Sequence, residues 1–412
     1  MQRVATIAAA MLLAVTAGPA QARWITSWTA APVNPSPAMG PFPATPAFND
    51  RTFRQTVRLS AGGRGLRIRF TNAYGKMPLT IGAARVALLD DRGGEVAGSS
   101  RTLHFAGSTK AVAAVAAPIV SDRIALDVGP LSRLSVSLYL PGETGPCTCH
   151  ATGLDQTDIS APGDHSAAPF APASTSGARA FLSAVEVDAA DDARTIVVLG
   201  DSISDGVGST SGANRRWPDL LAERLARRGG AAWGVANQGI SGNRVLQDGM
   251  GESALARLDR DVLGVAGAKA VILFEGVNDL GIAFTPAATG AQAAPPMPLP
   301  SRAIDADEII AGYRQIIDRA HAQGLKVYGA TIAPYKGAAY WSPAGEAARQ
   351  KINAFIRTGG LFDAALDFDR VFADPADPAA IRADFHMGDH LHGNDRSYRA
   401  VAESIDLALF DK

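Results

Sequence analysis

The chain has 412 residues, with 39 Lys or Arg and 40 Asp or Glu, so its formal net charge is −1 at pH 7. Charged residues of both signs are interspersed along it, which argues against a nucleic-acid-binding protein, because such proteins usually carry a basic patch. The length is sufficient for two domains with sizeable cores.

Residues 1–22 have the three-part layout of a secretory signal peptide. Arg3 lies near the start, an apolar core follows over residues 4–17, and Ala20, Gln21 and Ala22 fit a cleavage site. This core is short for a bilayer span, and no other stretch of about 18 apolar residues occurs. We therefore expect a secreted or periplasmic bacterial protein that makes no stable membrane insertion once the signal peptide is removed.

Residues 23–190 are expected to form an all-β sandwich domain. Several segments alternate apolar and polar residues in the manner of half-buried strands, and turn residues separate them. These segments are residues 56–60, 66–71 and 134–140. Residues 167–178, rich in Ala, Ser and Pro, predict a surface loop or linker, and residues 181–187 predict a last strand.

Cys147 and Cys149 are the only two cysteines, and they stand in a C-T-C sequence directly before His150. In an oxidising compartment the pair could form a disulfide, although the ring that it closes would be tight. Binding of a metal ion by Cys147, Cys149 and His150 is the alternative. The sequence leaves this choice open.

From residue 191 to residue 412 strands alternate with helices, which predicts a doubly wound α/β domain with a parallel sheet. Apolar residues at helical spacing predict helices over residues 217–228 and 308–323. Strands are expected over residues 196–199, 271–274, 327–332 and 364–368. Residues 285–303 form a Pro- and Ala-rich insertion, which is either a rim or lid beside the predicted pocket or a surface insert.

The sequence V-V-L-G-D-S, from Val197 to Ser202, is the most informative part of the chain. An apolar strand stops at Gly200, and Asp201 and Ser202 follow at once. In open α/β sheets ligands bind at this edge, so the Ser202 hydroxyl is placed for chemistry. An ordinary turn after a strand would have the same appearance.

Three further motifs follow, namely N-Q-G at residues 237–239, G-V-N-D at residues 276–279 and D-H-L-H at residues 389–392. Ser202 is the candidate nucleophile, and His392 is the candidate base, because imidazole suits that role near neutral pH. Asp389 stands three residues earlier, close enough to orient the ring. Each motif also fits a structural reading as a turn, a strand end or a helix cap. No G-x-S-x-G sequence occurs, so an α/β-hydrolase nucleophile elbow is not indicated.

With these motifs in this order, the chain from about residue 193 to residue 412 resembles the SGNH or GDSL-type hydrolase family. The resemblance implies a carboxylic ester hydrolase that needs no cofactor and uses Ser202, His392 and Asp389 as a catalytic triad. It further implies an oxyanion hole made of the backbone N–H groups of Ser202 and Gly239 and the side-chain amide of Asn278. Asp201 belongs to the family motif and is expected to hold the turn through backbone N–H groups.

Several alternatives remain at this point. Three histidines and a carboxylate lie within residues 386–392 and could bind zinc, which would leave His386 and His390 as ligands rather than as loop or pocket residues. A glycosidase could use Asp201 and Asp389 as its carboxylate pair. Within the esterase reading, the expected substrate is an acyl or acetyl ester of a carbohydrate, with a lipase or lysophospholipase as the alternative. In a different class, the chain could be a catalytically inactive carbohydrate-binding protein.

Overall fold

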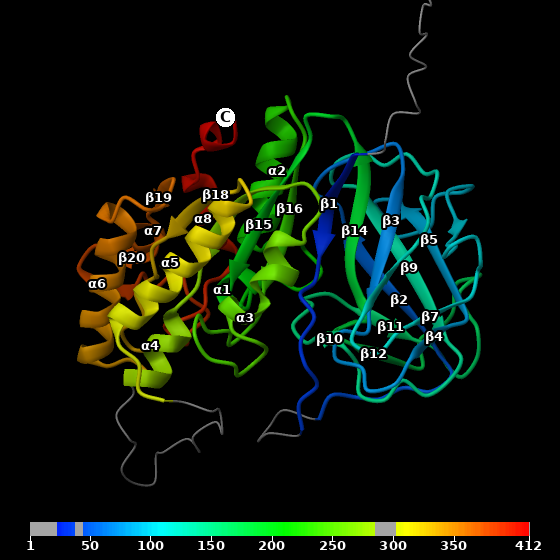
Figure 1. Cartoon of the computed structure of the whole chain (residues 1–412), viewed down its shortest axis with the longest axis horizontal. Coiled ribbons are helices and arrows are strands. Elements are labelled where there is room, and N and C mark those ends of the chain that lie inside the picture. The colour runs from blue at the N-terminus through cyan, green and yellow to red at the C-terminus, as the bar shows by residue number, and fades with distance from the viewer. Residues whose placement is uncertain (1–22, 38–43, 285–301, 412) are drawn as a thin grey trace, which may run out of the picture.

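The computed structural model describes residues 23–37, 44–284 and 302–411. The predicted signal peptide and most of the predicted insertion at residues 285–303 lie outside these residues. The described chain contains an N-terminal region of antiparallel sheets and a C-terminal region built on one parallel sheet (Figure 1). No helix among the described residues has the length and apolarity needed to cross a membrane.

Two antiparallel sheets make up most of the N-terminal region. The first sheet has the order β1 (Arg23–Thr29), β14 (Leu182–Ala189), β3 (Leu66–Thr71) and β8 (Pro118–Val120). The second sheet has the order β12 (Ser174–Ser176), β11 (Thr157–Ile159), β2 (Arg51–Arg58), β9 (Arg133–Leu140), β5 (Ala83–Leu89) and β6 (Arg101–Thr102). Two small pairs accompany them, β4 (Leu79–Ile81) with β7 (Ala111–Ala113) and β10 (Cys149–His150) with β13 (Arg179–Ala180).

The apolar faces of the two sheets meet in one core, which confirms the predicted β-sandwich. Successive side chains of a strand point to opposite faces, so Leu66, Ile68 and Phe70 of β3 all point inward and are fully buried. From the other sheet, Phe53 and Val136 enter the same cluster. The alternation seen in the sequence is therefore the signature of this packing.

Two details differ from the sequence expectation. Strand β2 begins at Arg51 rather than at residue 56, because its first half pairs with β9 and with β11. The predicted loop at residues 167–178 contains the short strand β12, which pairs with β11 at the edge of the sheet. Its composition is typical of a loop, and the strand exists because a neighbouring edge supplies hydrogen-bond partners.

The C-terminal region has a five-stranded parallel sheet, which confirms the predicted α/β class. The strand order is β16 (Trp233–Gly239), β15 (Arg194–Gly200), β17 (Ala268–Phe274), β18 (Lys326–Ala330) and β19 (Ala364–Leu366). The chain thus steps from β15 to one side for β16, and then to the other side for the remaining strands. Right-handed crossovers in opposite directions place helices on both faces of the sheet (Figure 1).

The helices differ in length and in how they are capped. They are α1 (Ser202–Asp205), α2 (Trp217–Arg228), α3 (Ala254–Leu258), α4 (Val277–Phe284), α5 (Ala306–Ala322), α6 (Pro343–Thr358), α7 (Phe368–Phe372) and α8 (Asp395–Ser404), with a π-helical turn η1 (Asp259–Leu263) and a 3-10 turn η2 (Leu407–Phe410). Helix α2 has the predicted bounds, and Pro218 fits its first turn. Helix α5 begins at a capping box formed by Asp305 and Glu308. A short hairpin, β20 (Ala373–Asp374) with β21 (Asp377–Ile381), follows α7.

The two regions share hydrogen bonds across their boundary. The N–H of Thr26 on β1 lies 3.0 Å from both the Thr195 hydroxyl oxygen and the Ala266 carbonyl oxygen. Farther along, Arg58 of β2 forms an ion pair at 2.8 Å with Glu223 of α2. The sandwich is therefore joined to the parallel sheet through its backbone and through side chains.

Candidate active site

The reversal of strand order in the parallel sheet places the candidate site between β15 and β17, where ligands bind in doubly wound sheets. Ser202 follows the end of β15 and is the first residue of α1. The Asp201 carboxylate caps this helix by accepting a hydrogen bond from the Ile203 N–H at 2.9 Å, as the sequence predicted. Because α1 begins at Ser202, the Ser202 N–H precedes the helical hydrogen-bond ladder.

Ser202, His392 and Asp389 lie in one hydrogen-bonded row. His392 Nε2 lies 2.9 Å from Ser202 Oγ, and His392 Nδ1 lies 2.5 Å from Asp389 Oδ2. The other carboxylate oxygen of Asp389 accepts the N–H groups of Leu391 and His392, both at 3.0 Å. In this arrangement the Asp389 carboxylate favours a proton on Nδ1, which leaves Nε2 as the acceptor that faces the Ser202 hydroxyl.

Asp389 is favoured in its charged form. Partial burial raises the pKa of its carboxyl group, but the hydrogen bonds from the His392 ring and backbone and from the Leu391 N–H outweigh burial, so the net pKa is lowered. A carboxylate that accepts several N–H groups is the expected partner for an imidazole that must become protonated during a reaction.

Asn278 lies in the first turn of α4, directly after the end of β17. Its amide donates one hydrogen bond to the Asn243 carbonyl at 2.9 Å, which leaves the second N–H of the amide for another acceptor. The neighbouring Asp279 carboxylate accepts the N–H groups of Val245 and Leu246. Burial raises the pKa of Asp279 to about 6. Helix α4 thus holds the loop that follows β16.

The structure does not give Gly239 the predicted oxyanion role. Its N–H donates to the Asn237 side-chain oxygen at 3.0 Å, and it pairs with Gly200 inside the sheet. A Cβ at Gly239 would lie only 2.4 Å from the Asp205 backbone nitrogen. This glycine therefore permits α1 to pack closely on β16, and its N–H is already occupied.

Gly242, three residues later, has a backbone N–H that no described residue occupies. It has a φ of +77°, which favours glycine. The next residue, Asn243, is the one whose carbonyl binds the Asn278 amide. The sequence signal was present as I-S-G after N-Q-G, but two glycines lay close together and the pattern did not distinguish them.

Arg257, a buried residue that the sequence analysis did not single out, forms hydrogen bonds with the ends of β15 and β16 and with the loop after β16. The fully buried Arg257 guanidinium donates to the carbonyls of Gly200 and Gln238 at 3.1 and 2.6 Å and to the Asn243 side chain at 3.0 Å. It joins the carboxyl ends of β15 and β16 to the loop that carries Gly242. Glu275 lies 3.9 Å away, and burial raises its pKa well above its usual value.

The metal-binding alternatives find no geometric support in the described part of the chain, which holds no cluster of three or more His, Cys, Asp or Glu arranged for a metal ion. His386 and His390 stack with their rings 4.3 Å apart, and His386 Nδ1 accepts the Gly388 N–H at 3.0 Å. Asp201 is buried and caps α1, which is a structural role rather than that of one member of a catalytic carboxylate pair.

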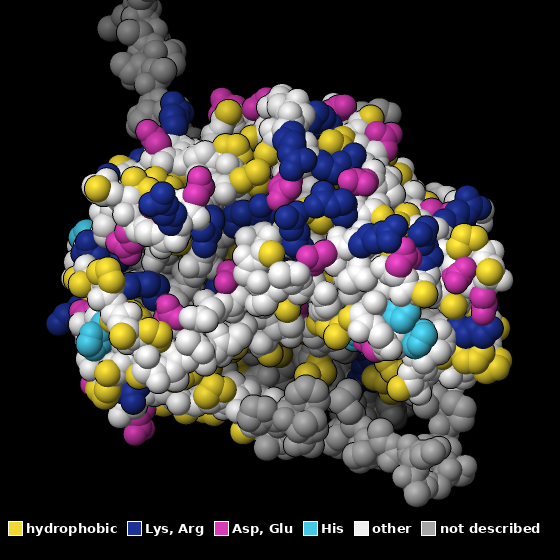
Figure 2. All heavy atoms as spheres, turned by 180° about the vertical axis from the view of Figure 1, so that it is seen from behind, with side chains coloured by type: hydrophobic (Ala, Val, Ile, Leu, Met, Phe, Trp, Pro, Cys, Tyr) yellow, Lys and Arg dark blue, Asp and Glu magenta, His cyan; other side chains and the backbone are white. Residues whose placement is uncertain are grey.

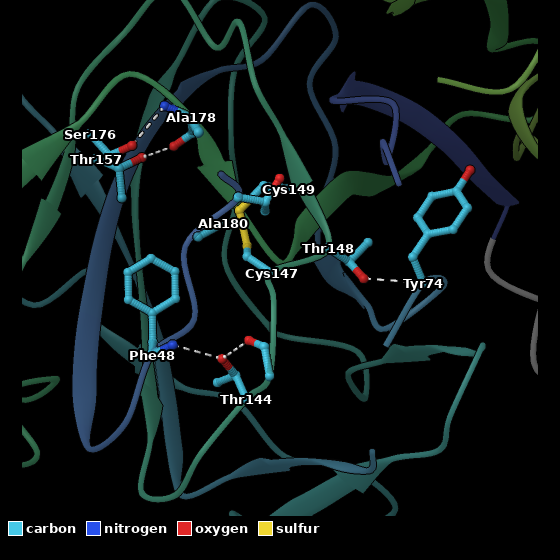
Figure 3. The surroundings of a disulfide bond; sticks show 12 residues. Phe48, Tyr74, Thr144, Cys147, Thr148, Cys149, Thr157, Ser176, Ala178 and Ala180 are labelled. Atoms are coloured by element: carbon cyan, nitrogen blue, oxygen red, sulfur yellow. Dashed lines mark hydrogen bonds between the residues drawn. A yellow bond between two sulfur atoms is a disulfide. The ribbon is translucent and has the colours of Figure 1, made fainter. Parts of the chain in front are cut away.

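Cys147 and Cys149 form a disulfide, so the alternative in which both bind a metal ion with His150 is wrong. Figure 3 shows this disulfide, which joins Cys149 of β10 to Cys147 just before it, and the residues around it. The His150 ring instead lies between the Ala31 carbonyl oxygen and the Asp205 carboxylate, each 2.9 Å from a ring nitrogen. This contact crosses from the sandwich to α1.

Comparison with known proteins finds matches to the C-terminal region of the chain. Residues 198–400 match the model of the GDSL-like lipase/acylhydrolase family. Similar solved structures include a GDSL-like lipase from Bacteroides thetaiotaomicron, at 18% identity over 53% of this chain and 88% of that one, with a TM-score of 0.38. They also include the acetyl xylan esterase AlAXEase, at 21% identity over 51% and 96% with a TM-score of 0.38. The esterase EstA from Pseudoalteromonas sp. is 18% identical over 53% and 95%, with a TM-score of 0.37. Among curated proteins no match was found.

Proposed function

Because residues 198–400 belong to the GDSL-like lipase/acylhydrolase family, the protein is a carboxylic ester hydrolase, and we propose that Ser202, His392 and Asp389 are its catalytic triad. The observation that carries this proposal is the 2.9 Å contact between His392 Nε2 and Ser202 Oγ. Asp389 on the far side of the ring supports it.

In the proposed reaction, His392 Nε2 takes the proton of Ser202 as Oγ forms a bond to the ester carbonyl carbon. The negative charge that develops on the carbonyl oxygen is stabilised by the N–H groups of Ser202 and Gly242 and by the free N–H of the Asn278 amide. His392 then gives its proton to the leaving alcohol oxygen as the ester C–O bond breaks. Water, activated in the same way, releases the acid from the acyl-enzyme and restores the Ser202 hydroxyl.

Covalent labelling tests this proposal. A phosphonate ester reagent should inactivate the full-length protein and add its mass to the peptide that contains Ser202. Exhaustive chelation should leave activity unchanged, because no step uses a metal ion. Labelling at another residue, or loss of activity on chelation with recovery on addition of zinc, would overturn the mechanism.

For the substrate, we propose acyl or acetyl esters on carbohydrate, handled outside the cytoplasm. The signal-peptide pattern at residues 1–22 and the β-sandwich that precedes the hydrolase region support this proposal. Acetate release from an acetylated polysaccharide is the expected result, and detection of the protein only in the cytoplasmic fraction would contradict the localisation.

One observation favours a second candidate, a lipase-type hydrolase of longer acyl chains. A cavity of about 490 Å³ lies at the edge of the sandwich, lined by its apolar side chains such as Phe48 and Ile159 and by Met250 from the loop after β16. Met250 packs closely on Gly242, since a Cβ atom placed on Gly242 would lie only 2.8 Å from Met250 Cγ. Hydrolysis of p-nitrophenyl esters of graded length separates the candidates, since activity rising from acetate to octanoate favours the second.

A further inference from the structure

We propose that His150 of the N-terminal β region is a positioning residue for the hydrolase site, acting through Asp205 on the helix that begins with the nucleophile. This inference rests on the proposed catalytic role of Ser202. It means that the sandwich forms part of the working site rather than a module attached beside it.

The hydrogen bonds of His150 bear on where its protons lie. Its Nδ1 lies 2.9 Å from the Ala31 carbonyl oxygen, and its Nε2 lies 2.9 Å from Asp205 Oδ1. A carbonyl oxygen can only accept, so Nδ1 carries a proton. In the proposed arrangement Nε2 carries a second proton, which it donates to Asp205 Oδ1, and His150 is then an imidazolium.

The surroundings of His150 agree with this assignment. Burial alone lowers the pKa of His150, but the charge and hydrogen bond of Asp205 and the Ala31 carbonyl outweigh burial, and the net pKa is raised. Arg216 opposes this effect weakly. Both members of the pair are almost fully buried.

Asp205 connects the two backbone turns that the reaction needs. It is the last residue of α1, where the N–H groups of Gly206 and Val207 close onto the carbonyl of Ser202. Its second oxygen, Oδ2, accepts the N–H and the hydroxyl of Ser241 at 3.0 and 2.7 Å. Ser241 directly precedes Gly242. One carboxylate thus fixes the nucleophile turn relative to the proposed oxyanion turn, and His150 fixes that carboxylate.

The chain holds His150 rigidly. It lies on β10 directly after the Cys147–Cys149 disulfide, and β10 pairs with β13 through Cys149 and Ala180. On the other side, Thr148 Oγ1 accepts the Tyr74 N–H at 3.2 Å, as Figure 3 shows. A buried ion pair contributes little net stability compared with an apolar contact of the same size. Its placement between two catalytic turns therefore points to positioning.

The test replaces His150 in the full-length protein. His150→Ala should lower kcat for a small soluble ester by about 10- to 100-fold, since displacement of a reacting group by about 1 Å has an effect of that order. KM should stay within about threefold, because the substrate does not contact His150. His150→Gln should restore part of kcat, since its amide can donate to Asp205.

The matched control is Arg58→Ala, which removes another ion pair between the two regions, at 2.8 Å to Glu223, but has no hydrogen bond to either turn. Its kcat should stay within about twofold of wild type. An equal loss in the Arg58 and His150 variants would show that only docking of the sandwich matters and would overturn the inference, as would a folded His150→Ala protein with kcat within about twofold of wild type.

Two measurements keep the inference testable if His150→Ala does not fold. Nitrogen-15 NMR of the wild-type imidazole should show both ring nitrogens protonated at pH 7.5, and a neutral ring would overturn the assignment. The Cys147→Ser/Cys149→Ser double variant should lower kcat with little change in KM, and unchanged kcat would count against the inference. If Ser202→Ala proves fully active, the proposed function fails, which is a result distinct from either of these.

Discussion

The parallel sheet and the β-sandwich place their functional side chains in different ways. In the parallel sheet, Ser202 and Asn278 follow the ends of the neighbouring strands β15 and β17, so the order of strands brings them together. In the sandwich, His150 lies on a two-residue strand and reaches Asp205 across the boundary. Under the roles proposed above, one region provides the reacting groups and the other holds them in place.

The largest expected effect tests the reacting groups. Ser202→Ala should lower kcat by at least about 1000-fold while the protein stays folded, because no other group can form the acyl-enzyme. Steady-state hydrolysis of p-nitrophenyl acetate, with circular dichroism to check folding, measures this. Ser209→Ala, in the loop after α1, is the control and should keep wild-type kcat. If folded Ser202→Ala keeps more than about a tenth of wild-type kcat, Ser202 is not the nucleophile.

The next largest expected effect concerns Asn278, which follows the neighbouring strand β17. Asn278→Ala removes an oxyanion donor and should lower kcat by about 100- to 1000-fold, with a small change in KM. The same assay measures both constants. If KM rises and kcat stays unchanged, Asn278 binds the ground state rather than the oxyanion, and the two strand ends would not act together.

A smaller effect concerns stability, and it tests how much the burial of the Asp201 carboxyl group lowers the free energy of unfolding. Burial raises the pKa of Asp201 to about 7, above the usual value of about 3.9. The folded state therefore binds more protons than the unfolded state between about pH 4 and 7, and stability falls as pH rises through that range. Asp201→Asn should flatten this dependence and raise the free energy of unfolding at pH 8 by on the order of 2 kcal/mol. Its amide oxygen can still accept the Ile203 N–H.

Urea unfolding at pH 5 and pH 8 measures this change. Asp279 and Glu275 also have raised pKa values because of burial, so part of the slope should remain in the variant. A variant that is less stable than wild type at pH 8 would contradict the prediction, because burial of the charged Asp201 carboxylate would then carry no net cost.

The smallest expected effect concerns the histidine-rich loop. His390→Ala should keep kcat within about twofold of wild type, because His390 has no hydrogen bond to Ser202, Asp389 or His392 through its ring. The same ester assay, with and without added zinc, provides the measurement. A loss of kcat above tenfold that added zinc reverses would support metal binding by residues 386–392.

Local patterns predicted those parts of the fold that depend on neighbouring residues. Strand β3 and helix α2 have the expected bounds, since alternation and helical spacing repeat within a few residues. Ser202, Asp389 and His392 were predicted together and lie together, while their catalytic roles stay predictions. The oxyanion role predicted for Gly239 finds no support, because its N–H donates to the Asn237 side chain. The sequence pattern does not give the position of that side chain.

Residues that act over long separations in sequence could not be found in this way. Arg257 donates to Gly200, and His150 contacts Asp205, yet neither lies in a motif with its partner. The disulfide depended on the compartment and on loop geometry, which left it open. In each case the decisive partner is brought close only by tertiary packing.

The pairing of β1 with β14 has a consequence for how the chain folds. Ile25 faces Val187 across these strands. The backbone groups of β1 therefore form their hydrogen bonds only once β14, the last strand of the sandwich, is in place. Closing so long a loop is entropically costly, and non-local strand pairing is slow. Because β1 also donates through Thr26 to Ala266, we expect its docking to be a late event that couples the folding kinetics of both halves of the molecule.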